Sequence, residues 1–151
     1  MNKPIRHSYW GQATDHRDLL RKIEEIGPIL EKNVSADEAA GELTQETFEA
    51  LRPLRMSHIM APEELGGAQL PPRQVLEVIE AITWHSGSAG WVSMVHAGIG
   101  AMSAAFLPDT AIEKLFTPGT EHRFSGQGAP LGMLKRVEGG YRLNGRWSYG
   151  S

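Results

Sequence analysis

The sequence predicts an α+β chain, in which an all-helical N-terminal domain over residues 1–120 precedes the first strands of an antiparallel β domain over residues 121–151. Two observations support this division. Before residue 117, apolar side chains recur at the three- and four-residue spacing of one helix face. After residue 123, short runs rich in β-branched and aromatic residues alternate with glycine turns, a pattern typical of strands.

The first predicted helix begins after Asp15, whose carboxylate can accept hydrogen bonds from the backbone N–H groups of the first turn. Pro28 is expected to bend this helix rather than end it, because apolar residues continue at helical spacing beyond it. A capping-box pattern at Ser35 and Glu38 predicts a separate short helical segment, which Gly41 would close.

Further helices are predicted along the first domain. Thr44 is expected to open one of them, and residues 59–67 then form a loop that contains a proline and a pair of glycines. Pro71 and Pro72 suit the first turn of the next helix. Asp109 is expected to cap a last short helix over residues 110–116.

The helix predicted over residues 88–105 is the most apolar stretch of the chain. At 100° per residue its larger apolar side chains share one face, with His96 on the edge of that face. Because this helix is small and apolar on most sides, we expect it to be central and buried rather than to span a membrane. The residues on the predicted buried face are Val92, Val95, Ile99 and Met102.

The end of the chain predicts a three-stranded meander. Its runs are Met133–Val137, residues 141–143 and residues 146–151, separated by a Glu-Gly-Gly turn and by Asn144-Gly145. An Asn-Gly pair favours a two-residue type I′ turn, since both of its central positions need a positive φ. The pattern therefore predicts antiparallel strands that open a larger β structure.

Composition excludes several classes of function. The net charge is −3 with no basic patch, so neither nucleic-acid binding nor attraction to acidic membranes has electrostatic support. The chain has no cysteine, which removes disulfides and thiolate chemistry and is compatible with the cytoplasm, where we expect the protein to reside. The first ten residues lack the apolar core of a secretory signal.

His96 and the glycine-rich residues 125–132 are the candidate functional features. His96 is either a proton donor or acceptor in a dry pocket or a core histidine that bonds a neighbouring carbonyl, and spacing alone favours the core histidine. Glycines in residues 125–132 let the backbone approach a ligand, although no P-loop or dinucleotide pattern is present and an ordinary connector remains the alternative.

Three tryptophans, Trp84, Trp91 and Trp147, can line an aromatic pocket, although large aromatic residues more often fill a core. The histidines show no H-x-x-x-H or similar ligand spacing, so we predict no metal. Paired carboxylates such as Glu63-Glu64 fall in loops or on wet helix faces, where a general-acid role is not expected.

The order of these signals resembles the acyl-CoA dehydrogenase fold superfamily over nearly the whole chain. P-E-E-L-G-G lies in the helical half and G-S-A-G-W opens the apolar helix, followed by a glycine-rich run that ends at Pro130. The most specific part is G-G-Y-R-L-N-G-R-W-S-Y-G-S at residues 139–151. The branch that it most resembles is that of the two-component flavin-dependent monooxygenases.

This resemblance implies a helical N-terminal domain followed by an antiparallel β-barrel, of which this chain carries only the opening strands. A separate flavin reductase would supply reduced FMN or FAD, which reacts with O₂ to oxygenate a small aromatic substrate. The resemblance also implies a homo-oligomer, a tetramer in full-length relatives. It places His96 and Ser125 near the reacting centre, and it assigns flavin contacts to Trp91, Gln127, Gly128 and Ser151.

One departure separates the two enzyme branches. Dehydrogenases carry T-E-P-x-x-G-S-D on the glycine-rich strand, whereas residues 128–133 here read G-A-P-L-G-M and lack those polar side chains. This disfavours an acyl-CoA dehydrogenase, which stays as the alternative enzyme. A third hypothesis is that the chain acts alone as a non-catalytic interaction or oligomerisation module, because an incomplete barrel exposes strand edges.

Overall fold

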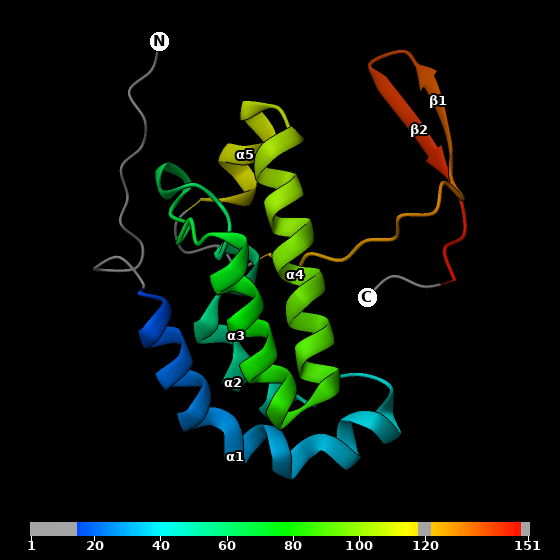
Figure 1. Ribbon diagram of the computed structural model, residues 1–151. Coiled ribbons are helices and arrows are strands. Elements are labelled where there is room, and N and C mark those ends of the chain that lie inside the picture. Colours follow the sequence, from blue (N-terminus) through cyan, green and yellow to red (C-terminus); the bar gives the residue numbers. More distant parts are fainter. Residues whose placement is uncertain (1–14, 118–121, 149–151) are drawn as a thin grey trace.

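The computed structural model describes residues 15–117 and 122–148. In these residues, five α-helices and three short 3₁₀ turns form a helical body, and an extended segment then leads to a two-stranded β hairpin. Figure 1 shows the hairpin projecting from the side of the body on which α4 lies. The predicted α+β class, helical first and antiparallel afterwards, is confirmed.

Helix α1, His16–Ala40, is a single continuous helix. Asp15 caps its first turn by accepting a hydrogen bond from the backbone N–H of Arg17 at 3.3 Å, and Gly41 closes it in the left-handed conformation with φ 68°. Pro28 lies inside the helix as predicted, and the ribbon bends so that its second half passes beneath α3 and α4 (Figure 1). The separate segment predicted at Ser35 is wrong, because the helix runs through that position.

Helix α2, Gln45–Leu51, is fixed to α1 by a buried carboxylate. The side chain of Asp37 accepts a hydrogen bond of 2.7 Å from the backbone N–H of Thr44 and one of 3.0 Å from the Thr47 hydroxyl. Thr44 is also the predicted N-cap, since its hydroxyl accepts from the backbone N–H of Thr47. Three 3₁₀ turns follow α2 and lead toward α3: Arg52–Leu54, Met56–His58 and Glu63–Leu65.

Helices α3, Pro72–His85, and α4, Gly87–Phe106, form a tight antiparallel pair joined at Ser86. The Ser86 hydroxyl caps α4 by accepting from the backbone N–H of Ala89. A Cβ atom at Gly90 would overlap the Thr83 side chain, so the absence of a side chain there permits the close approach of the two helices. The predicted proline start of α3 is confirmed, with Pro72 in the first turn.

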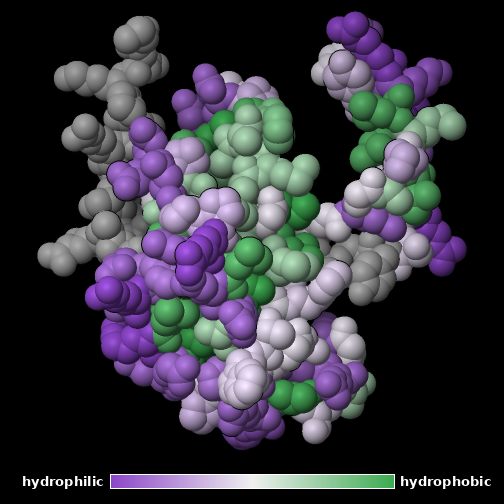
Figure 2. Space-filling model, in the orientation of Figure 1, coloured by the Kyte–Doolittle hydropathy of each residue, from purple (hydrophilic) through white to green (hydrophobic). Residues whose placement is uncertain are grey.

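The prediction of which face of α4 is buried is wrong. The buried residues are the small ones, whereas the predicted face is half-buried or, at Met102, exposed. Small residues form the buried face because they allow the helix backbone to approach the backbone of its neighbours. The larger apolar side chains then lie on the outside. Figure 2 accordingly shows hydrophobic residues gathered on the visible side of α4. The buried set is Ala89, Gly90, Ser93, Ala97 and Gly100.

Helix α4 is therefore not central to the body. By length and composition alone it is apolar enough to cross a membrane, with 28% of its 18-residue window buried. Core helices of soluble proteins pass the same test, and the small-residue face of α4 packs against α3 and the turn Met56–His58.

Two clusters of buried side chains hold the helical body together. The larger one joins α1, α2, α3 and α4, and its residues from α1 and α3 include Leu19, Ile23, Leu30, Val78 and Ile82. The smaller one contains Ala61, Phe116 and Phe124, and it fastens the start of the extended segment below α5, Asp109–Leu115. Pro108 rather than Asp109 occupies the N-cap of α5.

Strands β1, Met133–Val137, and β2, Gly140–Asn144, pair antiparallel, with Val137 opposite Gly140 and Met133 opposite Asn144. The turn lies at Glu138-Gly139, where Gly139 has φ 77°. The second predicted turn is wrong, because Asn144 is a paired strand residue. Residues 145–148 are not a strand, and the rest of the third predicted run lies outside the described residues.

Candidate functional site

Two adjoining cavities lie between α2 and α4. The smaller one, here called the basic cavity, has a volume of about 240 Å³, and the larger outer cavity has about 890 Å³. Because the two cavities share a wall, ligands bound in both of them would lie next to each other. Both cavities are lined by Leu43, Phe48, Val92, His96 and Arg123.

His96 lies on α4, in the wall that the two cavities share. It is half-buried and makes no hydrogen bond with another described residue, so the described residues do not include the carbonyl partner that a core histidine would have. Loss of hydration, followed by the charge of Arg123, lowers the pKa of His96 below its ordinary value of 6.5. The imidazole is therefore mainly neutral at pH 7 and has both a donor and an acceptor nitrogen available.

His58 lies at the bottom of the basic cavity, in the second 3₁₀ turn. Its Nδ1 is 2.9 Å from the Ser57 hydroxyl, and its ring meets the Phe116 ring edge-on at a centroid distance of 5.0 Å. Burial, with smaller contributions from the charges of Arg55 and His122, lowers the pKa of His58 to about 4. His58 is consequently a neutral hydrogen-bonding group at physiological pH.

The 3₁₀ turns also bring arginines to the basic cavity. Arg55 joins two of the turns with φ 45° and ψ 51°, a left-handed conformation that is uncommon for a residue with a side chain. Such backbone strain is often found at functional sites. Arg123 enters from the extended segment, and its guanidinium lies 4.3 Å from the centre of the Phe48 ring, a cation–π contact.

Gly100 fixes the position of the histidine-bearing turn against α4. A Cβ atom at this position would overlap the carbonyl oxygen of Ser57, so only glycine lets the backbone of the turn lie directly on the helix. Gly100 follows His96 by four residues, about one helical turn along α4. The same helix thus supplies His96 and sets the depth at which His58 lies.

The outer cavity brings together two of the residues singled out from the sequence. Trp91 is 47% exposed and lines this cavity with His96, while Ser148 lines it from the segment that follows the hairpin. Ser151, three residues further along, lies outside the described residues. The second half of α1 contributes Asp37 and Glu38 to the same cavity.

The remaining predicted residues lie on the extended segment and do not line either cavity. Ser125 and Gly128 are exposed. The Oε1 atom of Gln127 is buried and has no hydrogen-bond partner among the described residues, which makes it a candidate for a ligand contact. Gly126 lies against Ile99 of α4, so the segment passes close to the helix that carries His96.

The tryptophans do not fill a core, contrary to the interpretation favoured from the sequence. Trp84 and Trp91 are exposed on α3 and α4, and Trp147 packs against Gly132 and Gly145 at the base of the hairpin. Sequence reasoning also missed Arg55, His58 and Arg123. No spacing connects these three residues, because the fold brings them together from separate segments.

Comparisons with known proteins are consistent with this geometry. The flavin-dependent monooxygenase oxygenase subunit HsaA of Mycobacterium tuberculosis is 29% identical over 140 residues, which cover 93% of this chain and 35% of that protein. The indole-3-acetate monooxygenase of Pseudomonas putida is 29% identical over 109 residues, which cover 72% of this chain and 28% of that protein. No model of a known protein family matches the chain.

Solved structures agree with the sequence matches. The crystal structure of HsaA superposes with a TM-score of 0.80 at 29% identity, covering 91% of this chain and 37% of that one. XiaF from Streptomyces sp., in complex with FADH2 and glycerol, superposes with a TM-score of 0.79 at 25% identity, covering 89% of this chain and 34% of that one. The chain shares its fold with flavin-dependent monooxygenases. The resemblance expected from its glycine and tryptophan patterns is confirmed, and the chain spans about a third of the length of the curated relatives it matches.

Proposed function

We propose that residues 1–151 form the helical part and the first β strands of an oxygenase that uses reduced flavin and O₂ to hydroxylate a small aromatic molecule. The observation that carries this proposal is the agreement of the likeness to monooxygenases with the paired cavities beside His96. Flavin and substrate must lie next to each other, and the shared wall of the two cavities meets that need.

The residues of the outer cavity fit a flavin. Its volume of about 890 Å³ is within the range of about 300–1,000 Å³ for cofactor sites. Trp91 presents a half-exposed indole on which a flat ring can stack, and Val92 adds an apolar wall. When bound there, reduced flavin would supply the activated oxygen that the protein side chains cannot make.

We assign roles to this chain's own side chains accordingly. Neutral His96, in the wall between the cavities, would hydrogen-bond the substrate and hold or accept its proton at a ring nitrogen. Ser125 would lie near the reacting centre. Gln127, Gly128 and Ser151 would contact the edge of the flavin, with the unpartnered Oε1 of Gln127 as an acceptor for a flavin N–H.

The proposal extends to partners and location. A separate flavin reductase would deliver reduced FMN or FAD, because relatives of this chain are named as the oxygenase subunit or oxygenase component of their systems. The protein would act in the cytoplasm, where reduced flavin is produced, and it would assemble as a homo-oligomer. Apolar side chains on the outside of α4 support such assembly, among them Met102 and Phe106.

The test uses the native polypeptide that carries residues 1–151. It would be mixed anaerobically with reduced FMN or FAD and then with O₂, while the return of oxidised-flavin absorbance is followed. We expect tight binding of one reduced flavin and a slower return than for free flavin. Hydroxylated product should form from an aromatic substrate. Neither slowed oxidation nor any product with either flavin would count decisively against a monooxygenase.

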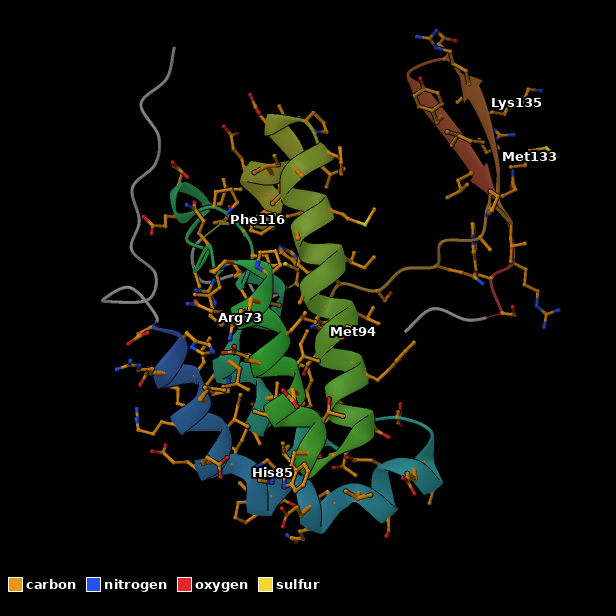
Figure 3. The ribbon with its side chains drawn as sticks, viewed as in Figure 1. Arg73, His85, Met94, Phe116, Met133 and Lys135 are labelled. Carbon is orange, nitrogen blue, oxygen red and sulfur yellow. The ribbon has the colours of Figure 1, made fainter. Side chains whose placement is uncertain are left out.

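His96 provides the residue-level part of this test. The variant His96→Asn should lower the rate of product formation by about 10²–10⁴, the range for loss of a general acid or base. Met94→Ala is the matched control, because Met94 lies on the same helix, lines neither cavity and points outward (Figure 3). Equal activity of the two variants would show that His96 has no role in the reaction.

A second candidate is a non-catalytic interaction module, and the hairpin favours it. All residues of β1 and β2 are exposed, and each strand has an unpaired edge in the described structure. Titration of the 151-residue chain with reduced flavin separates the candidates. Absence of flavin binding, together with concentration-dependent self-association in sedimentation, would support the module.

A further inference from the structure

The basic cavity carries more positive than negative charge. Three guanidinium groups line it, from Arg52, Arg55 and Arg123, but only one carboxylate, from Glu49. That carboxylate is already engaged, because its Oε2 lies 2.9 Å from Nε of Arg52. The lining therefore carries more guanidinium groups than carboxylates, and Arg123 is the arginine whose surroundings can be followed in detail.

Arg123 is the arginine best placed to meet a ligand. Its guanidinium lies over the Phe48 ring, and no carboxylate forms an ion pair with it in the part of the chain that the structure describes. Stacking on Phe48 fixes the plane of the guanidinium and leaves its N–H edge for an acceptor. An arginine held in this way can bind a carboxylate through two parallel hydrogen bonds.

His58 and His96 do not add to the positive charge of the cavity at pH 7, because burial and neighbouring charges lower the pKa of each. Arg55 and Arg123 both disfavour protonation of nearby histidines, as the lowered pKa values of His58 and His96 show. His122 lies with Nε2 3.2 Å from the Lys114 carbonyl. His58 and His96 are thus neutral polar groups beside a positive potential, an environment that favours an anion with further polar atoms.

The remaining lining is apolar and indicates an organic anion rather than an inorganic one. Phe48, Leu51, Met56 and Val92 form the walls, and the volume of about 240 Å³ suits a molecule with a single ring. A phosphate or sulfate would leave this apolar surface uncovered, whereas an aromatic ring would bury it. Burial of apolar surface contributes about 25 cal/mol per Å².

We propose that the basic cavity binds a small aromatic carboxylic acid, with its carboxylate on Arg123 and its ring against Phe48 and Val92. That this acid is the compound hydroxylated rests on the function proposed above. The binding itself requires no flavin. In this arrangement His96 stands between the ring of the acid and the outer cavity, where the oxygenating cofactor would lie.

Equilibrium binding to the 151-residue chain tests the proposal, with benzoate as the probe and benzamide as its neutral isostere. Titrations followed by heteronuclear NMR report affinity and place the ligand on the chain. We expect benzoate to bind at least tenfold more tightly than benzamide and to shift the signals of Arg123, Phe48 and His96. Raising the ionic strength should weaken benzoate alone, because added ions screen the charge. Equal affinity for both probes would overturn the proposal.

Variants locate the charge. Arg123→Gln should lower the affinity for benzoate about tenfold and leave the affinity for benzamide unchanged. Arg123→Lys should lower the benzoate affinity less, because it keeps the positive charge. Arg136→Gln on the exposed hairpin is the control for net charge and should have no effect. Circular dichroism verifies that each variant is folded. Unchanged benzoate affinity in Arg123→Gln would reject Arg123 as the anchor.

Competition separates this site from a flavin phosphate site. Inorganic phosphate and FMN should not displace benzoate if the cavity selects an aromatic carboxylate. Displacement by either would reassign the cavity to a phosphate and contradict the proposal. Failure of benzoate to bind, with normal flavin binding by the native polypeptide, would refute the substrate class alone. The reverse result would refute the monooxygenase function and leave the acid-binding site standing.

Discussion

The helical body and the hairpin differ in how their side chains are used. In the body, α1, α3 and α4 bury a continuous cluster in which Leu19, Ile23 and Ile82 are fully shielded from solvent. In the hairpin, none of the ten strand residues is buried. The body thus contains its own source of stability, whereas the hairpin has only its turn and cross-strand pairs.

The pattern of the hairpin shows what it lacks. Residues opposite one another in the register share a face, so Leu134 and Leu143 lie together with Arg136 and Tyr141, while Lys135 and Arg142 lie on the other face. A two-stranded hairpin is marginally stable in water, and three or more strands or a packed helix are needed. The apolar pair therefore indicates a surface made to be covered by further structure, as the expected barrel would provide.

The largest expected effect is on the core of the body. Ile82→Ala removes a fully buried side chain of α3 from the larger core cluster, and it should lower the free energy of unfolding by about 2–5 kcal/mol. Urea denaturation followed by circular dichroism measures this change. A loss below about 1 kcal/mol would show that the body is not a packed core and would remove the contrast with the hairpin.

Acidification should destabilise the body through His58. Its pKa is about 4 in the folded chain against an ordinary value of 6.5, so the unfolded chain takes up the proton first. Stability from neutral His58 is complete above pH 6.5 and is lost as the pH falls toward 4, by up to about 3 kcal/mol. The unfolding free energy, measured by denaturation between pH 4 and pH 6.5, should depend less on pH in His58→Gln than in the unchanged chain. Identical pH profiles would exclude His58 as the cause.

Two glycines of α4 give a matched pair. Gly100→Ala places a methyl group on the Ser57 carbonyl and should cost about 1–3 kcal/mol, as overpacking does. Gly98→Ala on the same helix meets nothing within 4 Å and should instead stabilise by about 0.5–1 kcal/mol. Thermal unfolding measures both variants. The same sign for the two changes would contradict the close packing of α4 on the turn that carries His58.

The smallest effect is expected in the hairpin. Leu134 is 62% exposed, so Leu134→Ala should change the unfolding free energy of the 151-residue chain by less than about 0.5 kcal/mol. Hydrogen exchange should show little protection at β1 and β2 beside strong protection in α1 and α3. A cost comparable with that of Ile82→Ala would mean that the hairpin belongs to the same cooperative unit as the helices.

The features that could be predicted from the sequence are those that depend on near neighbours. Asp15, Gly41 and Thr44 were identified as caps because capping is a contact between residues a few positions apart. Pro72 was placed in a first helical turn for the same reason. The order of helices and strands followed from their periodicity.

Features that depend on distant segments were missed. The buried face of α4 was misassigned because apolar size was taken as the guide, whereas Gly90 and Gly100 decide the packing. Asn144-Gly145 was assigned to a turn, but strand pairing continues through Asn144. The basic cavity could not be predicted, since its lining residues, such as Arg55 and Arg123, come from segments that are far apart in the sequence.

Pro28 determines the shape of α1. Proline has no N–H to bond the carbonyl four residues earlier, and its ring crowds that carbonyl, so the helix bends at this point. The first half is anchored in the core by Leu19 and Ile23, while the second half ends at Asp37 and Gly41, which line the outer cavity. Because Leu30, which follows Pro28, is buried in the same core cluster, both halves of α1 are held in place, and the bend directs the C-terminal end of the helix to the outer cavity.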